Sequence, residues 1–259
     1  GSIVLDPEEG QLASLHEGEG RLPDIGVIMN GIRDLFKLPL PLKGKKVLVT
    51  AGPTREAIDP VRFISNRSSG KMGYALAEKA RDMGAEVTLV SGPVSIPPVH
   101  EVLMIKVENA VEMENEVLQF SKSADFIFMT AAVADYTPAK PADLKIKRKT
   151  EKMTLPLNPA PDILKSINGK TNAVIIAFAL ETHDGENEAQ RKMKEKETDF
   201  MVLNYANEKG AGFDSSTNRV TIFSKNGGKI ELKKDRKDRI AQKIIDFVLQ
   251  FSNQPKLTK

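Results

Sequence analysis

The sequence predicts one α/β domain built on a doubly wound, mainly parallel sheet with an added β-hairpin. Three observations predict it. Strand-like and helix-like segments alternate from Lys45 onward, which is typical of strands joined by covering helices. The strand-like segments are apolar throughout, as strands buried on both faces are. The chain has 259 residues, enough for one large domain with a core of its own.

The predicted helices and strands follow from the runs and the spacing of apolar residues. Apolar runs bounded by glycine or turn residues predict strands, and apolar residues at helical spacing predict helices. The predicted strands are Lys46–Thr50, Glu86–Val90, Val102–Val107, Asp125–Ala132, Ala173–Ala179 and Phe200–Asn204. The predicted helices are Gly70–Met83, Ala110–Ser121, Asp162–Asn168, Asn187–Glu197 and Asp235–Phe251. The hairpin joins Val220–Phe223 to Ile230–Leu232 through a glycine turn.

The two ends of the chain differ from this pattern. Residues 1–43 are turn-rich, with a short predicted helix at Val27–Phe36. We interpret them as a tag remnant, Gly1-Ser2, followed by a linker or the tail of a preceding domain. Residues 44–252 form the predicted folded domain, and residues 253–259 a frayed C-terminal tail.

Composition excludes several classes of function. With 40% hydrophobic and 28% charged residues, we expect the chain to be neither disordered nor a membrane protein, and we expect no signal segment at its start. The absence of cysteine excludes disulfides, thiol nucleophiles and Cys-type metal sites, and three histidines leave little for a metal. A balance of 38 basic against 35 acidic residues is too even for a general nucleic-acid binder. We expect a soluble, cytoplasmic protein without a nucleic-acid or membrane partner.

The first candidate site follows the first strand, because ligands of parallel sheets bind at the carboxyl ends of the strands. Neither G-x-G-x-x-G nor a P-loop is present there. The stretch Gly52–Ser69 shows no obvious structure, which is uncommon in a loop without a function. Ser68, Ser69 and Gly70 open a helix whose N–H groups suit a phosphate or carboxylate. The alternative is that one serine only caps the helix.

Two further strand ends add weaker signals. Ala131 and Ala132 would let a flat ligand lie against the backbone, with the Asp135 carboxylate at the rim. The alternative is helix-packing alanines and a capping aspartate. Phe178 would stack on a base, although a buried phenylalanine is more often part of the core.

Basic residues accompany these strand ends. The run Lys145–Lys149 would neutralise a polyphosphate, and Lys192 and Lys196 share one helix face. Both sets have an alternative as solvated surface, with Glu188 as an intrahelical partner of Lys192. Taken together, the signals predict a nucleotide site with lysines around the phosphates.

Several strings resemble those of one enzyme family. They are Gly52-Pro53-Thr54, Asp59-Pro60-Val61-Arg62, Ile64-Ser65-Asn66, Ser68-Ser69-Gly70-Lys71-Met72-Gly73, the run Ala131–Tyr136 and Lys145-Ile146-Lys147. The chain from about Gly44 to the last helix resembles phosphopantothenate–cysteine ligases, the synthetase half of a bacterial bifunctional flavoprotein of coenzyme A biosynthesis. That resemblance implies a Rossmann-like, nucleotide-binding ligase domain at residues 44–252.

The resemblance also implies a reaction. The carboxylate of 4′-phosphopantothenate attacks the α-phosphate of CTP, and L-cysteine then displaces CMP from the acyl-cytidylate. Mg²⁺ is the implied cofactor, with its protein ligands unknown and Asp135 a candidate. The resemblance implies a homodimer and a mobile flap around residues 140–160. The base stays open, since relatives from eukaryotes use ATP.

Residue roles carry over by position. Asn66 matches a family asparagine that contacts the acyl-cytidylate, Arg62 an arginine needed for its conversion, and Lys145 a catalytic lysine beside the triphosphate. The implied nucleotide contacts are Ala131, Ala132, Asp135, Pro161, Asp162, Ile163, Leu164, Phe178, Lys192 and Lys196. We expect them to act with the strand-end residues Gly52, Ser68, Ser69 and Gly70.

The N-terminal segment resembles the tail of the flavin-dependent decarboxylase that precedes this domain in the bifunctional protein. In Leu12–Leu15, Ser14 stands where that family has a catalytic cysteine. We therefore expect a decarboxylase domain fused N-terminally in the full-length protein, and neither FMN binding nor decarboxylation by this chain.

Two alternatives from other classes remain. A nicotinamide-dependent reductase of Rossmann type is disfavoured by the missing G-x-G-x-x-G and Tyr-x-x-x-Lys patterns. A non-catalytic nucleotide-binding module is disfavoured by the presence of Asn66 and Lys145.

Overall fold

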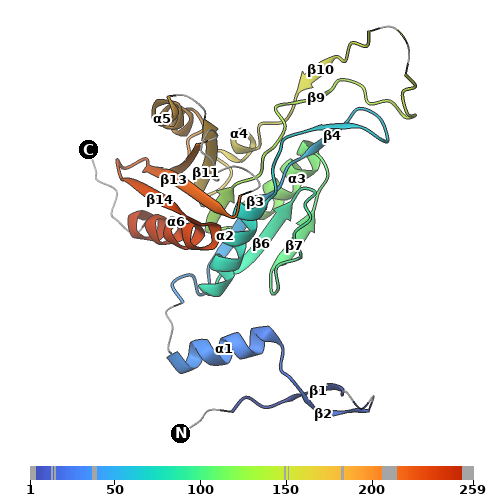
Figure 1. Ribbon diagram of the computed structural model, residues 1–259. Coiled ribbons are helices and arrows are strands. Elements are labelled where there is room, and N and C mark those ends of the chain that lie inside the picture. Colours follow the sequence, from blue (N-terminus) through green and yellow to red (C-terminus); the bar gives the residue numbers. More distant parts are fainter. Residues whose placement is uncertain are drawn as a thin grey trace. The chain divides into compact units, whose positions relative to one another are not determined.

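The central sheet has eight strands. They are β3 (Lys46–Ala51), β6 (Glu86–Ser91), β7 (Leu103–Lys106), β8 (Phe126–Met129), β11 (Val174–Glu181), β12 (Phe200–Tyr205), β13 (Thr217–Ser224) and β14 (Lys229–Arg236). In this computed structural model they lie in the order β14-β13-β12-β11-β8-β3-β6-β7 (Figure 1). The structure describes residues 4–12, 14, 16–36, 40–148, 150, 152–181, 184–205 and 215–252.

The strand order reverses next to β3, in the middle of the sheet. From β3 the chain builds β6 and β7 on one side, and it then returns to build β8, β11 and β12 on the other, all parallel. β13 and β14 extend the sheet as an antiparallel hairpin. The doubly wound, mainly parallel Rossmann-like fold with an added hairpin is thereby confirmed. Such a reversal leaves a crevice beyond the strand ends, here between β3 and β8.

Helices cover both faces of the sheet (Figure 1). α2 (Lys71–Asp82) and α6 (Lys237–Ser252) pack on one face together with inward side chains such as Val47 and Val49. α3 (Ala110–Ser121), α4 (Ile163–Ile167) and α5 (Gly185–Glu195) pack on the other face, α3 and α4 against Leu48. Successive side chains of a strand alternate between the two faces, so the uniformly apolar strands supply both cores.

Short strands occupy segments that the sequence leaves without structure. β4 (Arg55–Ala57) and β5 (Phe63–Ser65) pair antiparallel within Gly52–Ser69, so the expectation of an unstructured stretch there is wrong. β9 (Tyr136–Pro138) and β10 (Leu157–Pro159) form a second pair, and the flap expected around residues 140–160 covers the segment that joins them together with β10. Strands of three residues are too short for alternation to mark them.

The predicted strand Asp125–Ala132 ends early, at Met129. The Thr50 hydroxyl accepts the N–H groups of Thr130 (3.1 Å) and Ala131 (3.2 Å), and these bonds take the place of ladder bonds. Thr130, Ala131 and Ala132 therefore form a loop at the sheet edge.

The chain divides into two compact units, Gly1–Pro41 and Leu42–Lys259. The first contains β1 (Glu8–Gln11) and β2 (Glu17–Arg21), an antiparallel pair, followed by α1 (Ile25–Phe36). The predicted helix is present, and the hairpin that precedes it was not predicted from the sequence. The interpretation of these residues as a tail of a preceding domain stays a prediction. Gly1-Ser2, Lys149 and the tail 253–259 lie outside the described residues.

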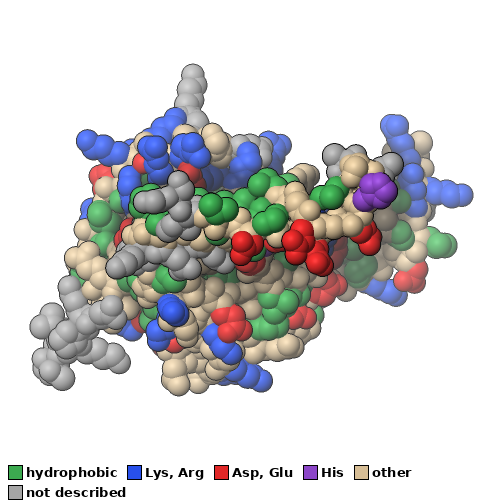
Figure 2. Space-filling model, turned by 90° about the horizontal axis from the view of Figure 1, so that it is seen from below, with side chains coloured by type: hydrophobic (Ala, Val, Ile, Leu, Met, Phe, Trp, Pro, Cys, Tyr) green, Lys and Arg blue, Asp and Glu red, His purple; other side chains and the backbone are tan. Residues whose placement is uncertain are grey.

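The surface mixes charges of both signs. Figure 2 shows Lys and Arg side chains interspersed with Asp and Glu side chains on the visible face, in line with a net charge of +3. Within the described ranges, every helix is too short or too polar to cross a bilayer.

Candidate functional site

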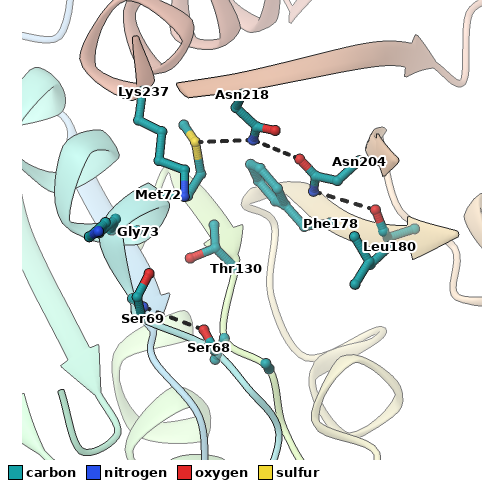
Figure 3. Close-up of a pocket in the computed structure, with 15 residues that line it drawn as sticks. Ser68, Ser69, Met72, Gly73, Thr130, Phe178, Leu180, Asn204, Asn218 and Lys237 are labelled. Carbon is teal, nitrogen blue, oxygen red and sulfur yellow. Dashed lines mark hydrogen bonds between the residues drawn. The ribbon is translucent and has the colours of Figure 1, made fainter. Parts of the chain in front are cut away.

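A pocket opens beyond the carboxyl ends of β3 and β8, at the start of α2 (Figure 3). Its wall combines segments that are far apart in the chain: the start of α2, the loop after β8, and residues of β11, β12, β13 and α6. The lining residues are Ser68, Ser69, Gly70, Lys71, Met72, Gly73, Thr130, Ala131, Ala132, Phe178, Ala179, Leu180, Asn204, Asn218 and Lys237. The pocket lies where the strand order reverses, as expected for a ligand site in this fold.

The start of α2 presents main-chain N–H groups to this pocket. Gly70 is the N-cap, with φ at 75°, and no side chain caps the helix. Ser68 only accepts a long bond of 3.4 Å from the Gly70 N–H, so the alternative that a serine caps the helix is wrong. An uncapped helix start of this kind attracts anions through its N–H groups and dipole.

Two glycines let the helix start lie close to β3. A Cβ on Gly70 would lie 3.3 Å from the Gly52 nitrogen, and both residues have positive φ. A Cβ on Gly73 would lie 2.5 Å from the Thr130 Oγ1 and 2.9 Å from the Thr50 carbonyl oxygen. Gly52 therefore packs directly against the start of α2, although it is not among the described residues that line the pocket.

The loops after β3 and β8 are joined by hydrogen bonds. The Ala132 N–H donates to the Gly52 carbonyl (2.8 Å), and the Ala134 N–H donates to the Thr54 hydroxyl (3.0 Å). The Asn66 amide donates to the carbonyls of Ala132 (3.2 Å) and Val133 (2.9 Å). The structure thus places Asn66, a predicted site residue, in contact with the loop that contains the predicted residues Ala131 and Ala132.

Arg62 and the lysine run meet on a buried carboxylate. Asp59, whose side chain has no exposed surface, accepts two bonds from the Arg62 guanidinium (2.5 and 3.0 Å) and one from the Ile146 N–H (3.1 Å). Arg62 also donates to the Ile146 carbonyl (2.8 Å). The Arg62 guanidinium holds the pKa of Asp59 far below its ordinary value, although desolvation opposes the shift. The segment carrying Lys145 is thereby tied to Arg62.

Asp59 belongs to a string that carries the family resemblance, but it was not predicted as a site residue from the sequence. Its signal is the pair Asp59 and Arg62 three residues apart, a spacing that closes a turn with a charged bond. Arg62 and Lys145 themselves are exposed and do not line the pocket described above.

Two of the predicted lysines, Lys192 in α5 and Lys196 at the C-cap of that helix, are bonded to carboxylates. Lys192 donates to Glu181 (2.6 Å), at the end of β11, and Lys196 pairs with Asp162, the N-cap of α4. The expected pairing of Lys192 with Glu188 is wrong, because Glu188 bonds Arg191 instead (2.9 Å). These lysines lie beside the predicted segment 161–164 and do not line the pocket.

Of the remaining predicted residues, Phe178 lines the pocket and the others do not. Phe178 is half-buried and lines the pocket, while it also packs against the core. Asp135 and Asp162 are exposed, Pro161 and Leu164 are half-buried and Ile163 is buried, and none of the five is among the described residues that line the pocket. Among the described residues, no three His, Asp or Glu side chains gather into a group that would hold a metal.

Some pocket residues were missed by the sequence prediction. Asn218 is 5% exposed and donates from its amide to Asn204 (2.8 Å), which in turn donates to the Ala179 carbonyl (3.4 Å). Lys237, at the start of α6, is 8% exposed. An asparagine at the start of an apolar strand is a signal that could have found Asn218, whereas Lys237 follows a charged stretch without a distinctive pattern.

Comparison with known protein families identifies the family of this chain. The family model for the DNA/pantothenate metabolism flavoprotein C-terminal domain matches residues 42–251. The chain belongs to this family. The match begins at the boundary between the two compact units and ends within α6, so it contains the whole sheet and the pocket.

Relatives of this flavoprotein C-terminal domain extend the comparison. The coenzyme A biosynthesis bifunctional protein CoaBC of Bacillus subtilis is 43% identical over 98% of this chain. The chain spans 64% of the length of that protein. A cysteine/cysteine sulfinic acid decarboxylase from an unknown prokaryotic organism is 42% identical over 96% of this chain and 71% of its own length. The crystal structure of the C-terminal domain of a CoaBC protein is 39% identical, covers 82% of this chain and 97% of that one, and has a TM-score of 0.70.

Proposed function

We propose that this family member is a phosphopantothenate–cysteine ligase of coenzyme A biosynthesis, as the names of its CoaBC relatives support. The observation that carries the proposal is the pocket at the strand reversal. It combines the uncapped start of α2 with Lys71 and Lys237, and its described lining includes no carboxylate. A site with this charge suits a nucleoside triphosphate.

The first step forms an acyl-cytidylate. A carboxylate oxygen of 4′-phosphopantothenate attacks the α-phosphorus of CTP, the bond to the bridging oxygen breaks, and pyrophosphate leaves. The main-chain N–H groups at Ser69, Gly70 and Lys71 would stabilise the developing phosphate charge. Lys145, on the segment tied to Arg62, would close over the triphosphate.

The second step forms the amide. The amine of L-cysteine attacks the acyl carbon, loses a proton and displaces CMP, which gives 4′-phosphopantothenoylcysteine. Asn66 would orient the acyl-cytidylate, since its amide lies against the Ala132 and Val133 carbonyls at the pocket rim. Arg62 would bind the substrate from the same side. The rate gain in both steps would come mainly from holding the reacting groups close together and correctly oriented.

The substrate would bring Mg²⁺ with it. Mg²⁺ commonly takes one or two carboxylates together with phosphate oxygens and water. Asp135, an exposed carboxylate three residues after the pocket residue Ala132, would be the carboxylate in this mode. When bound, the ion would neutralise the triphosphate charge.

The nucleotide would extend from this pocket toward α4 and α5. Ala131, Ala132 and Phe178 would hold the base, and Lys192 and Lys196 would exchange their present carboxylate partners for phosphate oxygens. We further propose CTP rather than ATP, a cytoplasmic homodimer, a domain boundary near residue 44, and an N-terminally fused decarboxylase in the full-length protein.

One assay tests the proposal. Purified chain is mixed with phosphopantothenate, L-cysteine, Mg²⁺ and either CTP or ATP, and pyrophosphate and the amide product are measured. We expect pyrophosphate release with CTP, and a roughly 100-fold lower rate for Lys145→Gln at unchanged thermal stability. Lys152→Gln, an exposed lysine in the same loop, is the matched control and should retain the rate.

The same assay separates the alternatives. Pyrophosphate release with ATP but not with CTP would show that the enzyme uses adenine nucleotides. CTP binding without any pyrophosphate release would favour a non-catalytic module. Absence of binding and release with either nucleotide would refute the ligase, and oxidation of a nicotinamide cofactor would then be tested.

A further inference from the structure

Two asparagines form a line of hydrogen bonds along one wall of the pocket. Asn218 of β13 donates from its amide to the Asn204 side-chain oxygen (2.8 Å), and Asn204 of β12 donates to the Ala179 carbonyl (3.4 Å) (Figure 3). Asn218 is 5% exposed and Asn204 is half-buried, and both line the pocket. Neither residue belongs to the strings that carry the family resemblance.

The two side chains meet because of the register of β12 and β13. Asn204 lies opposite Val220 in this antiparallel pair. Asn218 precedes Val220 by two residues, so its side chain lies on the same face of the sheet, diagonally across from Asn204. That face is the one covered by α2 and α6, and the Asn218 amide nitrogen lies 3.9 Å from the Met72 Sδ of α2. The pair therefore faces the start of α2.

The direction of these hydrogen bonds is set by main-chain groups at both ends. The Arg219 N–H, which can only donate, bonds the Asn218 side-chain oxygen (3.0 Å). The Ala179 carbonyl, which can only accept, lies at the other end. Each asparagine must therefore turn its oxygen toward the Arg219 end and its NH2 group toward the Ala179 end. Rotation of the Asn204 amide by 180° would place its NH2 group against that of Asn218.

This orientation presents an N–H donor to the pocket. The Asn204 NH2 group carries two N–H bonds. Among the described residues it donates to the Ala179 carbonyl alone, and 3.4 Å is a long separation for such a bond. The amide lies near the carboxyl end of β12, beside the pocket residues Phe178 and Leu180 of β11 (Figure 3). A nucleotide carries oxygen acceptors on its phosphates, its ribose and its base, so a donor fixed at this wall suits it.

We propose that Asn218 is a positioning residue, which holds the Asn204 amide in the orientation that donates a hydrogen bond to an oxygen of the bound nucleotide. The inference rests on the proposed function and adds to it a residue that acts through Asn204. Removal of Asn218 leaves the Asn204 amide free to rotate, and a side chain that must be ordered on binding weakens association. The effect of Asn218 on nucleotide affinity therefore depends on the presence of Asn204.

A double-mutant cycle on nucleotide affinity tests this assignment. Affinities for Mg·CTP and Mg·ATP are measured by calorimetry, and the nucleotide that the wild-type chain binds more tightly is used for Asn204→Ala, Asn218→Ala and the double variant. We expect each single substitution to weaken binding about three- to tenfold, the effect of one neutral hydrogen bond. In the Asn204→Ala background, Asn218→Ala should change the affinity by less than about twofold.

Thr221→Val is the matched control. Thr221 is buried, lies on β13 outside the described pocket lining, and its hydroxyl bonds the Tyr205 hydroxyl of β12 (3.1 Å). The control thus removes a buried hydrogen bond between the same two strands without touching Asn204. It should lower Tm and keep the wild-type affinity for the nucleotide.

Two results would overturn the assignment. The first is a loss of affinity below about twofold for either single variant, and the second is a loss above about twofold on adding Asn218→Ala to Asn204→Ala, which indicates a general loosening of the sheet. If Asn218→Ala does not fold, the crystal structure of the wild-type chain with the nucleotide decides. The Asn204 Nδ2 must then lie within about 3.2 Å of a nucleotide oxygen while the bond from Asn218 is kept, and a larger separation refutes the proposal. A wild-type chain that binds neither nucleotide refutes the proposed function itself, which is distinct from failure of the cycle in a chain that binds.

Discussion

Gly73 lets α2 pack closely against the sheet, and its replacement by alanine should disturb both the fold and the site. A Cβ at this position would lie 2.5 Å from the Thr130 Oγ1, 2.6 Å from the Ala51 Cβ and 2.9 Å from the Thr50 carbonyl oxygen. Ala51 and Thr50 belong to β3, so they cannot retreat without moving a central strand. The helix start would have to shift away from the sheet instead.

The expected loss of stability can be estimated from two opposing effects. Overpacking a well-filled core costs about 1–3 kcal/mol, and we take the upper half of that range because strand atoms are among the neighbours. Alanine recovers about 1 kcal/mol through its better helix propensity. The free energy of unfolding should therefore fall by about 1–2 kcal/mol, which lowers Tm by roughly 2–8 °C in a domain of this size.

Urea unfolding followed by circular dichroism measures this change. Gly185→Ala is the matched control, because its Cβ would lie 3.2 and 3.3 Å from the Leu203 methyl carbons and 3.4 Å from the Glu181 Cβ, with no backbone atom among these neighbours. The control should stay within about 1 kcal/mol of wild type. The affinity for CTP should fall in Gly73→Ala as well, since both Gly73 and Thr130 line the pocket. A Gly73→Ala protein as stable as wild type would refute the close packing.

Other variants examine the site directly. Asn66→Asp removes the amide donor to the Ala132 carbonyl and should lower the rate of pyrophosphate release about 100-fold with little change in Tm; a wild-type rate would contradict the role of Asn66. Asp59→Asn should release Arg62 and destabilise the chain in a pH-dependent manner, measured by urea unfolding from pH 3 to pH 8. The folded-state pKa of Asp59 lies below its ordinary 3.8, so the stability lost in the variant should be constant above about pH 5 and should shrink as the pH falls below 3.8. A loss that grows on acidification would contradict this sign. Lys192→Gln should weaken CTP binding about tenfold, and an unchanged affinity would exclude contact with the nucleotide.

Matched controls accompany these variants. Asn187→Asp adds the same charge at the start of α5, outside the described pocket lining; it gives up the amide bond to Asp184 (2.8 Å) but should keep the wild-type rate. Lys194→Gln removes an exposed lysine from the same helix as Lys192 and should keep the wild-type affinity for CTP.

The sequence by itself determined the architecture of the sheet and the part of the pocket that lies next to the strand ends. Strands buried on both faces must be apolar throughout, so β3, β8 and β11 could be recognised from composition alone. In a parallel sheet their carboxyl ends meet at one edge, which is why Ser69, Ala131 and Phe178 could be assigned to a common site.

Only the tertiary structure decided which distant residues complete that site. Asn218 and Lys237 reach the pocket because β13 adds antiparallel to β12 and returns α6 to the α2 side of the sheet. The spacing of Asp59 and Arg62 is local, but their bonds to Ile146 reach across more than 80 residues of chain, which no local pattern encodes. Periodicity reports which face of an element is buried, whereas the partner of that face depends on strand order and crossover, which are properties of the whole chain.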